Sequence, residues 1–565
     1  MLKGGMQQWP LTTGALIDHA ARQHGATEVV SRAADGRLVR SHWAGIAANA
    51  RAAAAGLAML GAERGDRVAT LAWNRAAHLE LYYAISAGGM VLHTVNPRLH
   101  ADQVRYVTAH GGARILCVDP DLLPIVTPIL PLLPEVHTVV VLGDIPADLP
   151  GGVRYLSYAD LLALAPPLAA WPVLDENDAA SLCYTSGTTG DPKGCLYSHR
   201  SILLHAFGIC AADSMALSAC DTVLLLPPMF HVNSWGVPFG AAMCGAKLVL
   251  PGNQLDGASL LALLRDERVT FSLGVPTVWF MLLDHIAAHT DAEARAALRL
   301  DRVFTGGAST PRALVQRFRD LLGVETMQAW GMTETSPVAA VCRPLGCQRD
   351  LPPEEALDLR AKAGRGVFGV ELRVEDEDGR GLPVGDAATG ALKVRGHWVI
   401  DRYFGAAADA VDADGWFDTG DVGRIDAHGF LQITDRSKDV IKSGGEWISS
   451  IELENAAAAH PAVAEAAVVG VAHPSWQERP LLLVRLHPDV PFDAEDMRAH
   501  LLRHVARWWL PDDIVVVDDL PHTASGKVVK AALRERYRDH LSSSAPSSAP
   551  SSASGGVEVK LGTGR

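Results

Sequence analysis

Residues 184–194 read YTSGTTGDPKG and combine hydroxyl side chains, glycines and one lysine in a short segment. The segment follows an apolar run at 180–184, which we expect to be a strand. Glycines allow positive φ angles and close approach of the backbone, so successive N–H groups can converge on an anion. Lys193 adds a mobile positive charge. This composition predicts a loop that binds a triphosphate, and a flexible surface loop is the less favoured alternative.

The spacing within this segment differs from that of a P-loop. In the P-loop motif GxxxxGK[ST], a Ser or Thr directly follows the lysine and reaches Mg²⁺. Here Lys193 is followed by Gly194. The P-loop interpretation is therefore excluded.

A second cluster, QAWGMTETSP at 328–337, follows an expected strand near Glu325. Trp330 could cover a flat base, Thr333 could donate to a phosphate, and Glu334 could bind Mg²⁺ through oxygen. A Thr-Glu helix cap is an equal alternative for this segment alone. Beside a triphosphate loop, we favour the functional interpretation.

Three further clusters are weaker on their own. WFDTGD ends at Asp421, whose carboxylate could accept both hydroxyls of a ribose, although an ordinary Asp turn fits equally well. DRSKDVIKSGGEW at 435–447 could be a solvated linker, but its Gly-Gly pair permits close passage of a chain-like ligand. TASGK at 523–527 places Lys527 on a loop, where it could reach phosphate as a mobile charge.

The elements that position these clusters alternate along the chain. Strands are expected at 67–71, 138–142, 180–184, 221–226, 247–250, 270–274, 302–304 and 325–328. Helices are expected at 79–88, 200–218, 258–267 and 311–321. This alternation predicts an α/β fold with mostly parallel sheets covered by helices.

Two smaller regions follow. A short antiparallel region is expected with strands at 371–375, 391–395, 423–426 and 430–434, the last two joined by a hairpin turn at 427–429. A separate α+β pattern follows, with helices at 450–459 and 494–506 and strands at 465–471, 481–487 and 514–517. We therefore predict a large N-terminal domain over 1–435, a smaller mobile C-terminal domain over 436–541 and a disordered Ser/Ala/Pro/Gly tail over 542–565.

Composition narrows the functional classes. The 565 residues carry a net charge of −14, so nothing electrostatic favours nucleic acid as a partner. Four prolines interrupt the longest apolar stretch, 122–142, so we expect no membrane span. No signal peptide is apparent, and the eight cysteines show neither CxxC pairs nor metal spacing. We expect reduced cysteines and a cytoplasmic protein.

Taken together, in this order, these clusters resemble the adenylate-forming superfamily of acyl-CoA synthetases, beetle luciferases and peptide-synthetase adenylation domains. The resemblance covers about residues 11–541. Within it, DRSKDVIKSGGEWISSIELEN and HVNSW at 231–235 are most similar to bacterial medium- and long-chain fatty acyl-CoA ligases and, equally, to 3-methylmercaptopropionate-CoA ligases. The resemblance implies that ATP and a carboxylate give acyl-AMP and pyrophosphate, after which CoA gives a thioester and AMP. ATP, Mg²⁺ and coenzyme A are the implied cofactors, and a homodimer is an open expectation.

The resemblance also implies roles for individual residues. The β- and γ-phosphates would be held by Thr185, Ser186, Gly187, Thr188, Thr189 and Lys193. The adenine would be framed by Gly306, Gly307, Ala308, Trp330 and Gly331. The α-phosphate would meet Thr333, the Mg²⁺ ion Glu334, and the ribose Asp421 and Arg436. The acid would lie beside His231, Trp235 and Pro337, with Lys527 bridging its carboxylate and the α-phosphate.

In this superfamily the small domain rotates between the two half-reactions. The hinge would be Lys438, and rotation would withdraw Lys527 and bring the 442–447 loop to the site. The residues of that loop with implied roles in thioester formation are Lys442, Gly444, Gly445, Glu446 and Trp447. Glu446 and Trp447 depart from the commonest pattern of the superfamily.

Three other functions compete with CoA ligation. A peptide-synthetase adenylation domain usually supplies an Asp near the start of the acyl pocket, and FHVNSW at 230–235 has no acid. A fatty acyl-AMP ligase acting with a carrier protein is the stronger alternative. A non-catalytic scaffold would not need Lys193, Glu334, Asp421, Arg436 and Lys527 together. The expected substrate is a medium-length aliphatic acid, roughly C4 to C10, with 3-methylthiopropionate included, because one methylene changes binding by only ~1–3 kcal/mol.

Overall fold

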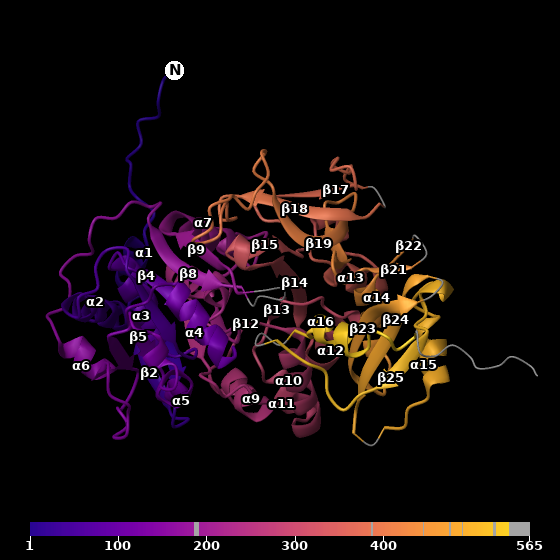
Figure 1. Ribbon diagram of the computed structural model, residues 1–565, viewed down its shortest axis with the longest axis horizontal. Coiled ribbons are helices and arrows are strands. Elements are labelled where there is room, and N and C mark those ends of the chain that lie inside the picture. Colours follow the sequence, from indigo (N-terminus) through magenta and orange to yellow (C-terminus); the bar gives the residue numbers. More distant parts are fainter. Residues whose placement is uncertain are drawn as a thin grey trace, which may run out of the picture.

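The computed structural model describes residues 1–185, 191–385, 388–443, 446–473, 476–488, 490–523 and 527–541. The predicted site residues Ser186, Gly187, Thr188, Thr189, Gly444 and Gly445 lie outside these ranges, as do the side chains of Glu446 and Trp447 and the predicted tail at 542–565. Figure 1 shows the N-terminal sheets and helices on the left and centre, an antiparallel sheet above them, and the C-terminal domain on the right.

The first large sheet is parallel except at one edge, and its strand order is β7-β6-β5-β3-β4-β8-β9. Its strands are β3 (Arg67–Leu71), β4 (Val91–Thr94), β5 (Ile115–Val118), β6 (Thr138–Val141), β7 (Arg154–Ser157), β8 (Ala179–Tyr184) and β9 (Gly194–Ser198). The accompanying helices are α2 (Trp43–Met59), α3 (Ala76–Ala87), α4 (Ala101–His110), α5 (Leu123–Val126) and α6 (Tyr158–Ala163). Strands β8 and β9 pair antiparallel and carry the two ends of the Gly/Thr loop.

The second large sheet has the order β16-β15-β14-β13-β12-β10-β11-β1-β2, with parallel pairs in its centre. Its strands are β1 (Glu28–Arg32), β2 (Leu38–His42), β10 (Thr222–Leu225), β11 (Lys247–Leu250), β12 (Phe271–Gly274), β13 (Arg302–Thr305), β14 (Glu325–Gly331), β15 (Val338–Val341) and β16 (Arg365–Gly366). The helices in this part are α1 (Thr13–Gln23), α7 (His199–Cys210), α8 (Val237–Cys244), α9 (Gly257–Asp266), α10 (Pro276–His289), α11 (Ala292–Ala296), α12 (Arg312–Leu322) and α13 (Pro353–Arg360).

The antiparallel sheet and the C-terminal domain complete the fold. The sheet consists of β17 (Val370–Glu375), β18 (Gly390–Gly396), β19 (Phe417–Ile425) and β20 (Leu431–Arg436). The C-terminal domain consists of β21 (Ile441–Ser443), β22 (Glu446–Ile448), α14 (Ser450–Ala458), β23 (Val463–His473), β24 (Gln477–Leu486), α15 (Ala494–Leu501), β25 (Asp513–Val516) and α16 (Lys530–Arg536). The predicted fold class, helix-covered and mostly parallel sheets followed by antiparallel and α+β parts, is confirmed.

Three predicted boundaries were wrong by five residues or more, and one segment expected to be a loop forms paired strands. The helix expected at 200–218 ends at Cys210, and the chain then turns through Ala216, whose φ is 53°. The helix expected at 494–506 ends at Leu501. The strand expected to begin at 423 begins at Phe417, so Asp421 lies within a strand and not in a loop. The segment around Lys442 is a β-hairpin, because β21 and β22 pair across it.

The large hydrophobic core lies between these layers and reaches the loops that carry the predicted site. Strands such as β4, β5 and β6 are buried along their whole length, which explains their continuous apolar sequences. Trp235 and Trp330 both pack against the same core cluster. Among the described residues, no helix combines the length and apolar character needed to cross a membrane.

Candidate active site

The base of the Gly/Thr loop is closed by two hydrogen bonds between its ends. The Thr185 N–H donates to the Lys193 carbonyl at 2.9 Å, and the Lys193 N–H donates to Thr185 Oγ1 at 3.1 Å. The Lys193 ammonium lies 4.8 Å from the centroid of the Tyr403 ring. A cation over an aromatic face is held while its charge stays available to a ligand.

Tyr403 links this lysine to the predicted metal ligand. Its hydroxyl donates to Glu334 Oε1 at 2.7 Å. Glu334 is buried in the short turn η4 (Thr333–Thr335), and its carbonyl accepts from the Ile400 N–H at 2.9 Å. Sequence reasoning missed Tyr403, because it lies 69 positions from Glu334 and belongs to no cluster of polar residues.

The turn at η4 requires a glycine before it. A Cβ on Gly331 would lie 1.8 Å from the Pro337 carbonyl oxygen, so no other residue allows this approach of the two backbones. The Met332 N–H donates to that same carbonyl at 3.2 Å. The GMTETSP sequence is therefore a closed turn that presents Thr333 and Glu334 at the end of β14.

Asp421 and Arg436 face each other across β19 and β20, where they are paired in register. Arg436 Nε lies 2.7 Å from Asp421 Oδ1, and Trp330 Nε1 donates to Asp421 Oδ2 at 2.9 Å. Each carboxylate oxygen keeps a lone pair for another donor. The three predicted nucleotide-binding side chains are therefore brought together, and the indole is oriented by the carboxylate.

The turn that carries His231 and Trp235 has an unusual backbone. Residues of η3 (Val232–Gly236) have φ values between 48° and 73°, so the turn is left-handed. A left-handed conformation costs ~1–2 kcal/mol per non-glycine residue. The turn is buried, and Ser234 Oγ donates to the Pro227 carbonyl at 2.5 Å. Strain that the surroundings enforce in this way is typical of ligand-binding sites.

The left-handed turn places Trp235 against the predicted adenine loop. A Cβ on Gly306 would lie 2.6 Å from the Ala329 carbonyl oxygen and 3.0 Å from Trp235 Cη2, so this position also requires glycine. Gly307 and Ala308 are exposed at the end of β13. The ring of Trp235, which belongs to the left-handed turn, therefore packs against the backbone of the loop after β13.

Lys527 reaches this same group of residues from the C-terminal domain. The residue is exposed as a whole, yet desolvation of its ammonium by the surrounding protein lowers its pKa to about 8. Repulsion by Arg436 lowers the pKa further, while Asp421 and Glu334 raise it. Burial, followed by the positive charge of Lys527, lowers the pKa of His231 to about 4, so that His231 is neutral at pH 7.

The other predicted residues of the C-terminal domain lie elsewhere. Lys438 is in the turn after β20, where the Asp439 and Val440 N–H groups donate to the Arg436 carbonyl. Lys442 is exposed on the β21–β22 hairpin, and its N–H donates to Glu478 Oε2 at 3.0 Å. The structure therefore brings Lys527, and not Lys442, to Glu334 and Asp421.

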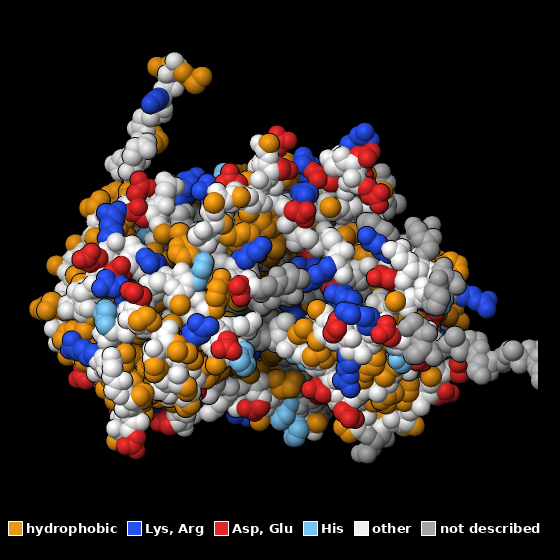
Figure 2. Space-filling view, viewed as in Figure 1, with side chains coloured by type: hydrophobic (Ala, Val, Ile, Leu, Met, Phe, Trp, Pro, Cys, Tyr) orange, Lys and Arg blue, Asp and Glu red, His pale blue; other side chains and the backbone are white. Residues whose placement is uncertain are grey.

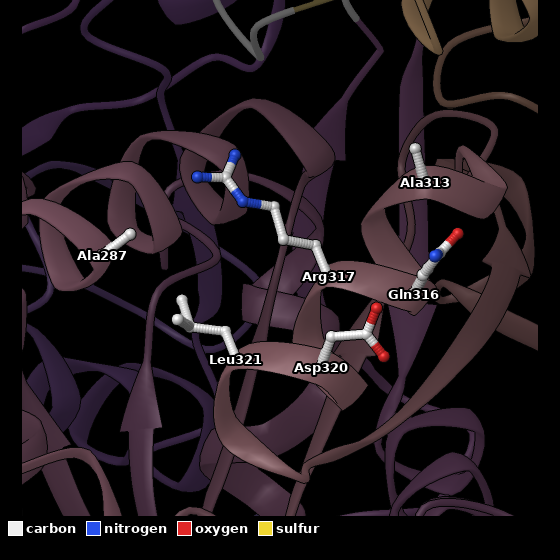
Figure 3. Close-up of a pocket in the computed structure, with 6 residues that line it drawn as sticks. All are labelled: Ala287, Ala313, Gln316, Arg317, Asp320 and Leu321. Atoms are coloured by element: carbon white, nitrogen blue, oxygen red, sulfur yellow. The ribbon is translucent and has the colours of Figure 1, made fainter. Parts of the chain in front are cut away.

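Two hollows of the structure can be compared by whether predicted site residues line them. A shallow depression of about 430 Å³ between α10 and α12 is lined by Ala287, Ala313, Gln316, Arg317, Asp320 and Leu321 (Figure 3). None of the predicted site residues lines it, and Arg317 already pairs with Asp284. A second, narrow slot is lined by Thr185 and His231 together with Thr94, Asn96 and Phe230. The chemistry places the candidate active site at the narrow slot and not at the larger depression.

Glu334 suits a magnesium ion. Its carboxylate is buried, and Tyr403 bonds only one of the two oxygens, Oε1, so that Oε2 has no hydrogen bond to a described residue. Mg²⁺ is typically held by one or two carboxylates together with phosphate oxygens of the substrate. Within the described ranges, no group of three or more His, Cys, Asp or Glu side chains forms a protein-only metal site.

Comparison with known proteins identifies the family of this chain. Residues 17–404 match the AMP-binding enzyme family, and residues 452–527 match the AMP-binding enzyme C-terminal domain. The chain is 48% identical to a 3-methylmercaptopropionyl-CoA ligase of Ruegeria lacuscaerulensis, over 95% of this chain and 99% of the relative. It is 46% identical to a medium-chain-fatty-acid–CoA ligase of Ectopseudomonas oleovorans, over 96% of this chain and 99% of the relative.

A solved structure shares the fold of this chain. The crystal structure of an anthranilate CoA ligase in complex with anthranoyl-AMP superposes with a TM-score of 0.82 at 24% identity, covering 95% of this chain and 100% of that one. The chain therefore belongs to the AMP-binding enzyme family. Within that family it is an acid–thiol ligase of the AMP-forming type, a class that uses ATP, Mg²⁺ and CoA.

Proposed function

We propose that this enzyme activates an uncharged, medium-length aliphatic carboxylic acid, roughly C4 to C10, and transfers the acyl group to CoA. The observation that carries this proposal is the buried left-handed turn from Val232 to Gly236, which follows His231, carries Trp235 and contributes no charged side chain of its own. An ionised group on the acyl tail would lose its hydration there without gaining a partner. The names of the two curated relatives support an aliphatic or thioether acid.

The first half-reaction joins the acid to AMP. A carboxylate oxygen attacks the α-phosphorus, and the bond between that phosphorus and pyrophosphate breaks. Lys193 and the loop after Thr185 hold the β- and γ-phosphates, and Thr333 donates to the α-phosphate. Bound Mg²⁺, held by Glu334 and phosphate oxygens, would neutralise charge on the triphosphate.

Lys527 is the residue that we assign to stabilising this step. With a pKa of about 8, its ammonium form predominates at pH 7. The acid carboxylate and the α-phosphate add negative charge beside it, which favours the protonated form further. Neutral His231 can lie against the carboxylate without competing for the ion pair with Lys527.

The second half-reaction moves the acyl group to sulfur. The CoA thiolate attacks the acyl carbonyl, and the bond to AMP breaks. We assign this step to the Lys442 side of the C-terminal domain, with Gly444, Gly445, Glu446 and Trp447 beside the thiol, after rotation about Lys438. The exposure of Lys442 in the present arrangement supports a second arrangement of the domains.

A panel of acids tests the substrate assignment. We would measure kcat/KM for propionate, butyrate, 3-methylthiopropionate, octanoate, palmitate and benzoate. We expect an optimum among butyrate, 3-methylthiopropionate and octanoate. Sulfur contact with the Trp235 ring is worth ~0.3–1.5 kcal/mol, which is enough to keep the thioether competitive. An optimum at palmitate or at benzoate would contradict the assignment while leaving the class of enzyme unchanged.

The acceptor needs its own experiment. A fatty acyl-AMP ligase would release acyl-AMP or pass the acyl group to a carrier protein. We expect thioester formation with CoA in preference to a phosphopantetheinylated carrier protein, because the KSGGEW segment would flank a free thiol. Acyl-AMP that accumulates in the presence of CoA would favour the alternative.

We further propose that the enzyme works in the cytoplasm as a homodimer. All eight cysteines are unpaired thiols, which suits a reducing compartment. The N-terminal arm stands away from the body in Figure 2, and its exposed Leu2, Met6 and Trp9 are suited to cover by a second copy. Analytical ultracentrifugation of the full chain and of a variant with Leu2, Met6 and Trp9 changed to Ser would test the dimer.

A further inference from the structure

Five buried polar side chains meet beneath the active site, where the first sheet touches the left-handed turn. We call this group the Cys183 junction. Its members are Thr94, Ser181, Cys183, Tyr197 and Asn233, and each is at most 2% exposed. They come from β4, β8, β9 and η3, which are far apart in the sequence. Buried polar groups of this kind are stable only when they bond one another.

The contacts join the turn to the sheet. Asn233 Oδ1 accepts from Cys183 Sγ at 3.4 Å and from Ser181 Oγ at 3.2 Å. Thr94 Oγ1 lies 3.4 Å from Cys183 Sγ, on the neighbouring strand of the sheet. Asparagine tolerates the left-handed region better than most residues, so Asn233 both adopts the strained backbone and anchors it.

A second branch leads to the nucleotide side. The Tyr197 hydroxyl contacts the Cys183 thiol and donates to the Thr333 carbonyl at 2.6 Å. Thr333 begins the turn that carries Glu334. Cys183 itself is two residues before Thr185, where the phosphate loop starts. One thiol therefore lies between the turn of His231, the phosphate loop and the turn of Glu334.

A thiol is well suited to the buried position of Cys183. Burial raises the pKa of Cys183, which keeps the sulfur protonated and able to donate. Sulfur is larger and softer than oxygen, so it can touch three partners at distances that a shorter hydroxyl meets less closely. A network with every member bonded holds one arrangement more firmly than separate pairs do.

We propose that Cys183, Tyr197 and Asn233 are positioning residues that couple the acyl side of the site to its nucleotide side. Thr94 of the junction lines the narrow slot, whereas Cys183, Tyr197 and Asn233 are not among its lining residues. It acts through Asn233 on the turn that holds the acid and through Tyr197 on the turn that faces the α-phosphate. This inference rests on the proposed function for the assignment of the two sides, and its test uses ATP binding, which the whole enzyme class shares.

The test substitutes Cys183 and measures the effect on both the nucleotide side and the acyl side of the site. Cys183→Ala removes the thiol contacts without adding volume, and Cys183→Ser keeps a hydroxyl in their place. Cys117→Ala is the matched control, because Cys117 is fully buried on β5 of the same sheet. Calorimetry with α,β-methylene ATP, which cannot release pyrophosphate, gives the nucleotide affinity. The ratio of kcat/KM for octanoate to that for butyrate reports changes on the acyl side of the site.

We expect Cys183→Ala to weaken α,β-methylene ATP binding by about five-fold or more, the lower end of typical coupling between sites. The octanoate-to-butyrate ratio should change in the same variant, whereas Cys183→Ser should fall between Cys183→Ala and the wild type, and Cys117→Ala should stay near the wild type. Equal nucleotide affinities for Cys183→Ala and Cys117→Ala would overturn the proposal. If the nucleotide affinity falls but neither fatty acid is a substrate, the junction stands and the proposed substrate fails.

A second pair covers the case in which Cys183→Ala does not fold. Tyr197→Phe removes only the hydroxyl that bonds Thr333. Tyr158→Phe removes another buried hydroxyl, which bonds Glu80 at 2.8 Å in another part of the domain. The proposal is supported if Tyr197→Phe binds α,β-methylene ATP more weakly than the wild type while Tyr158→Phe does not. Equal affinities of the two variants would contradict it.

Discussion

Two basic segments of the C-terminal domain differ sharply in their surroundings. Lys527 lies near Glu334, Asp421 and Arg436, and desolvation lowers its pKa to about 8. Lys442 lies on an exposed hairpin whose backbone is bonded within the same domain, to Glu478. In this arrangement of the domains, Lys527 lies at the site and Lys442 does not.

This difference explains how one site serves two reactions. Adenylation needs positive charge next to the carboxylate and the α-phosphate, whereas thioester formation needs a path for the thiol. Hydrogen bonds that join the two parts in this arrangement include the one from Asn455 Nδ2 to Ser309 Oγ at 3.4 Å and the one from the Ser450 N–H to Asp435 Oδ2 at 2.6 Å. We propose that such polar contacts are exchanged when the domains move relative to each other.

The largest effect is expected from removing the charge at the site. Lys527→Ala should slow pyrophosphate exchange by about 10²–10³-fold, because a group that stabilises transition-state charge is lost. Lys362→Ala, which breaks an ion pair with Asp426 on the surface, serves as the control. Exchange at the wild-type rate in Lys527→Ala would remove the main contrast between the two lysines.

A bulky side chain in the 442–447 segment should slow thioester formation and not adenylation. Gly445→Leu should reduce thioester synthesis by about 10–100-fold while pyrophosphate exchange continues, since small displacements at a thiol path are costly. Gly346→Leu is the matched control, because a side chain there meets open space. A parallel loss of both activities in Gly445→Leu would make the segment structural.

The hinge should be sensitive to a fixed backbone. Lys438→Pro restricts φ to about −65° and removes an N–H, so we expect one half-reaction to survive while the full cycle slows about ten-fold or more. Lys438→Ala keeps the backbone free and should turn over nearly normally. Full turnover in the proline variant would move the hinge to another residue.

The lowered pKa of Lys527 predicts a pH effect of several-fold. The charged form of the lysine is present below its pKa and is lost as the pH rises through about 8. Binding of α,β-methylene ATP should therefore weaken between about pH 7 and 9 in the wild type. Lys527→Ala should lack this inflection, and an unchanged pH profile in that variant would assign the effect to another group.

The last effect concerns chain length. Trp235→Ala should raise the activity on palmitate relative to octanoate by about ten-fold, because the added space accommodates more methylenes. Phe368→Ala, at an exposed position before β17, is the control. No change in the ratio would place the end of the acyl pocket away from Trp235.

The sequence predicted much of the fold and less of the site geometry. The predicted bounds of β3, β6 and β11 agree with the observed ones to within one residue. These strands were predictable because buried parallel strands have continuous apolar sequences. Helix ends were less accurate, as at Cys210, since local turns end helices without a strong signal. Tyr403 and the left-handed turn could not be predicted, because contacts distant in sequence create them.

The most direct test is the ratio of the two half-reactions, measured side by side in Lys527→Ala and Gly445→Leu. One assay follows pyrophosphate exchange, and the other follows thioester formation from supplied octanoyl-AMP and CoA. The two variants should shift the ratio in opposite directions, with Lys527→Ala retaining thioester formation and Gly445→Leu retaining exchange. A shift in the same direction in both variants would contradict the assignment of one lysine segment to each reaction.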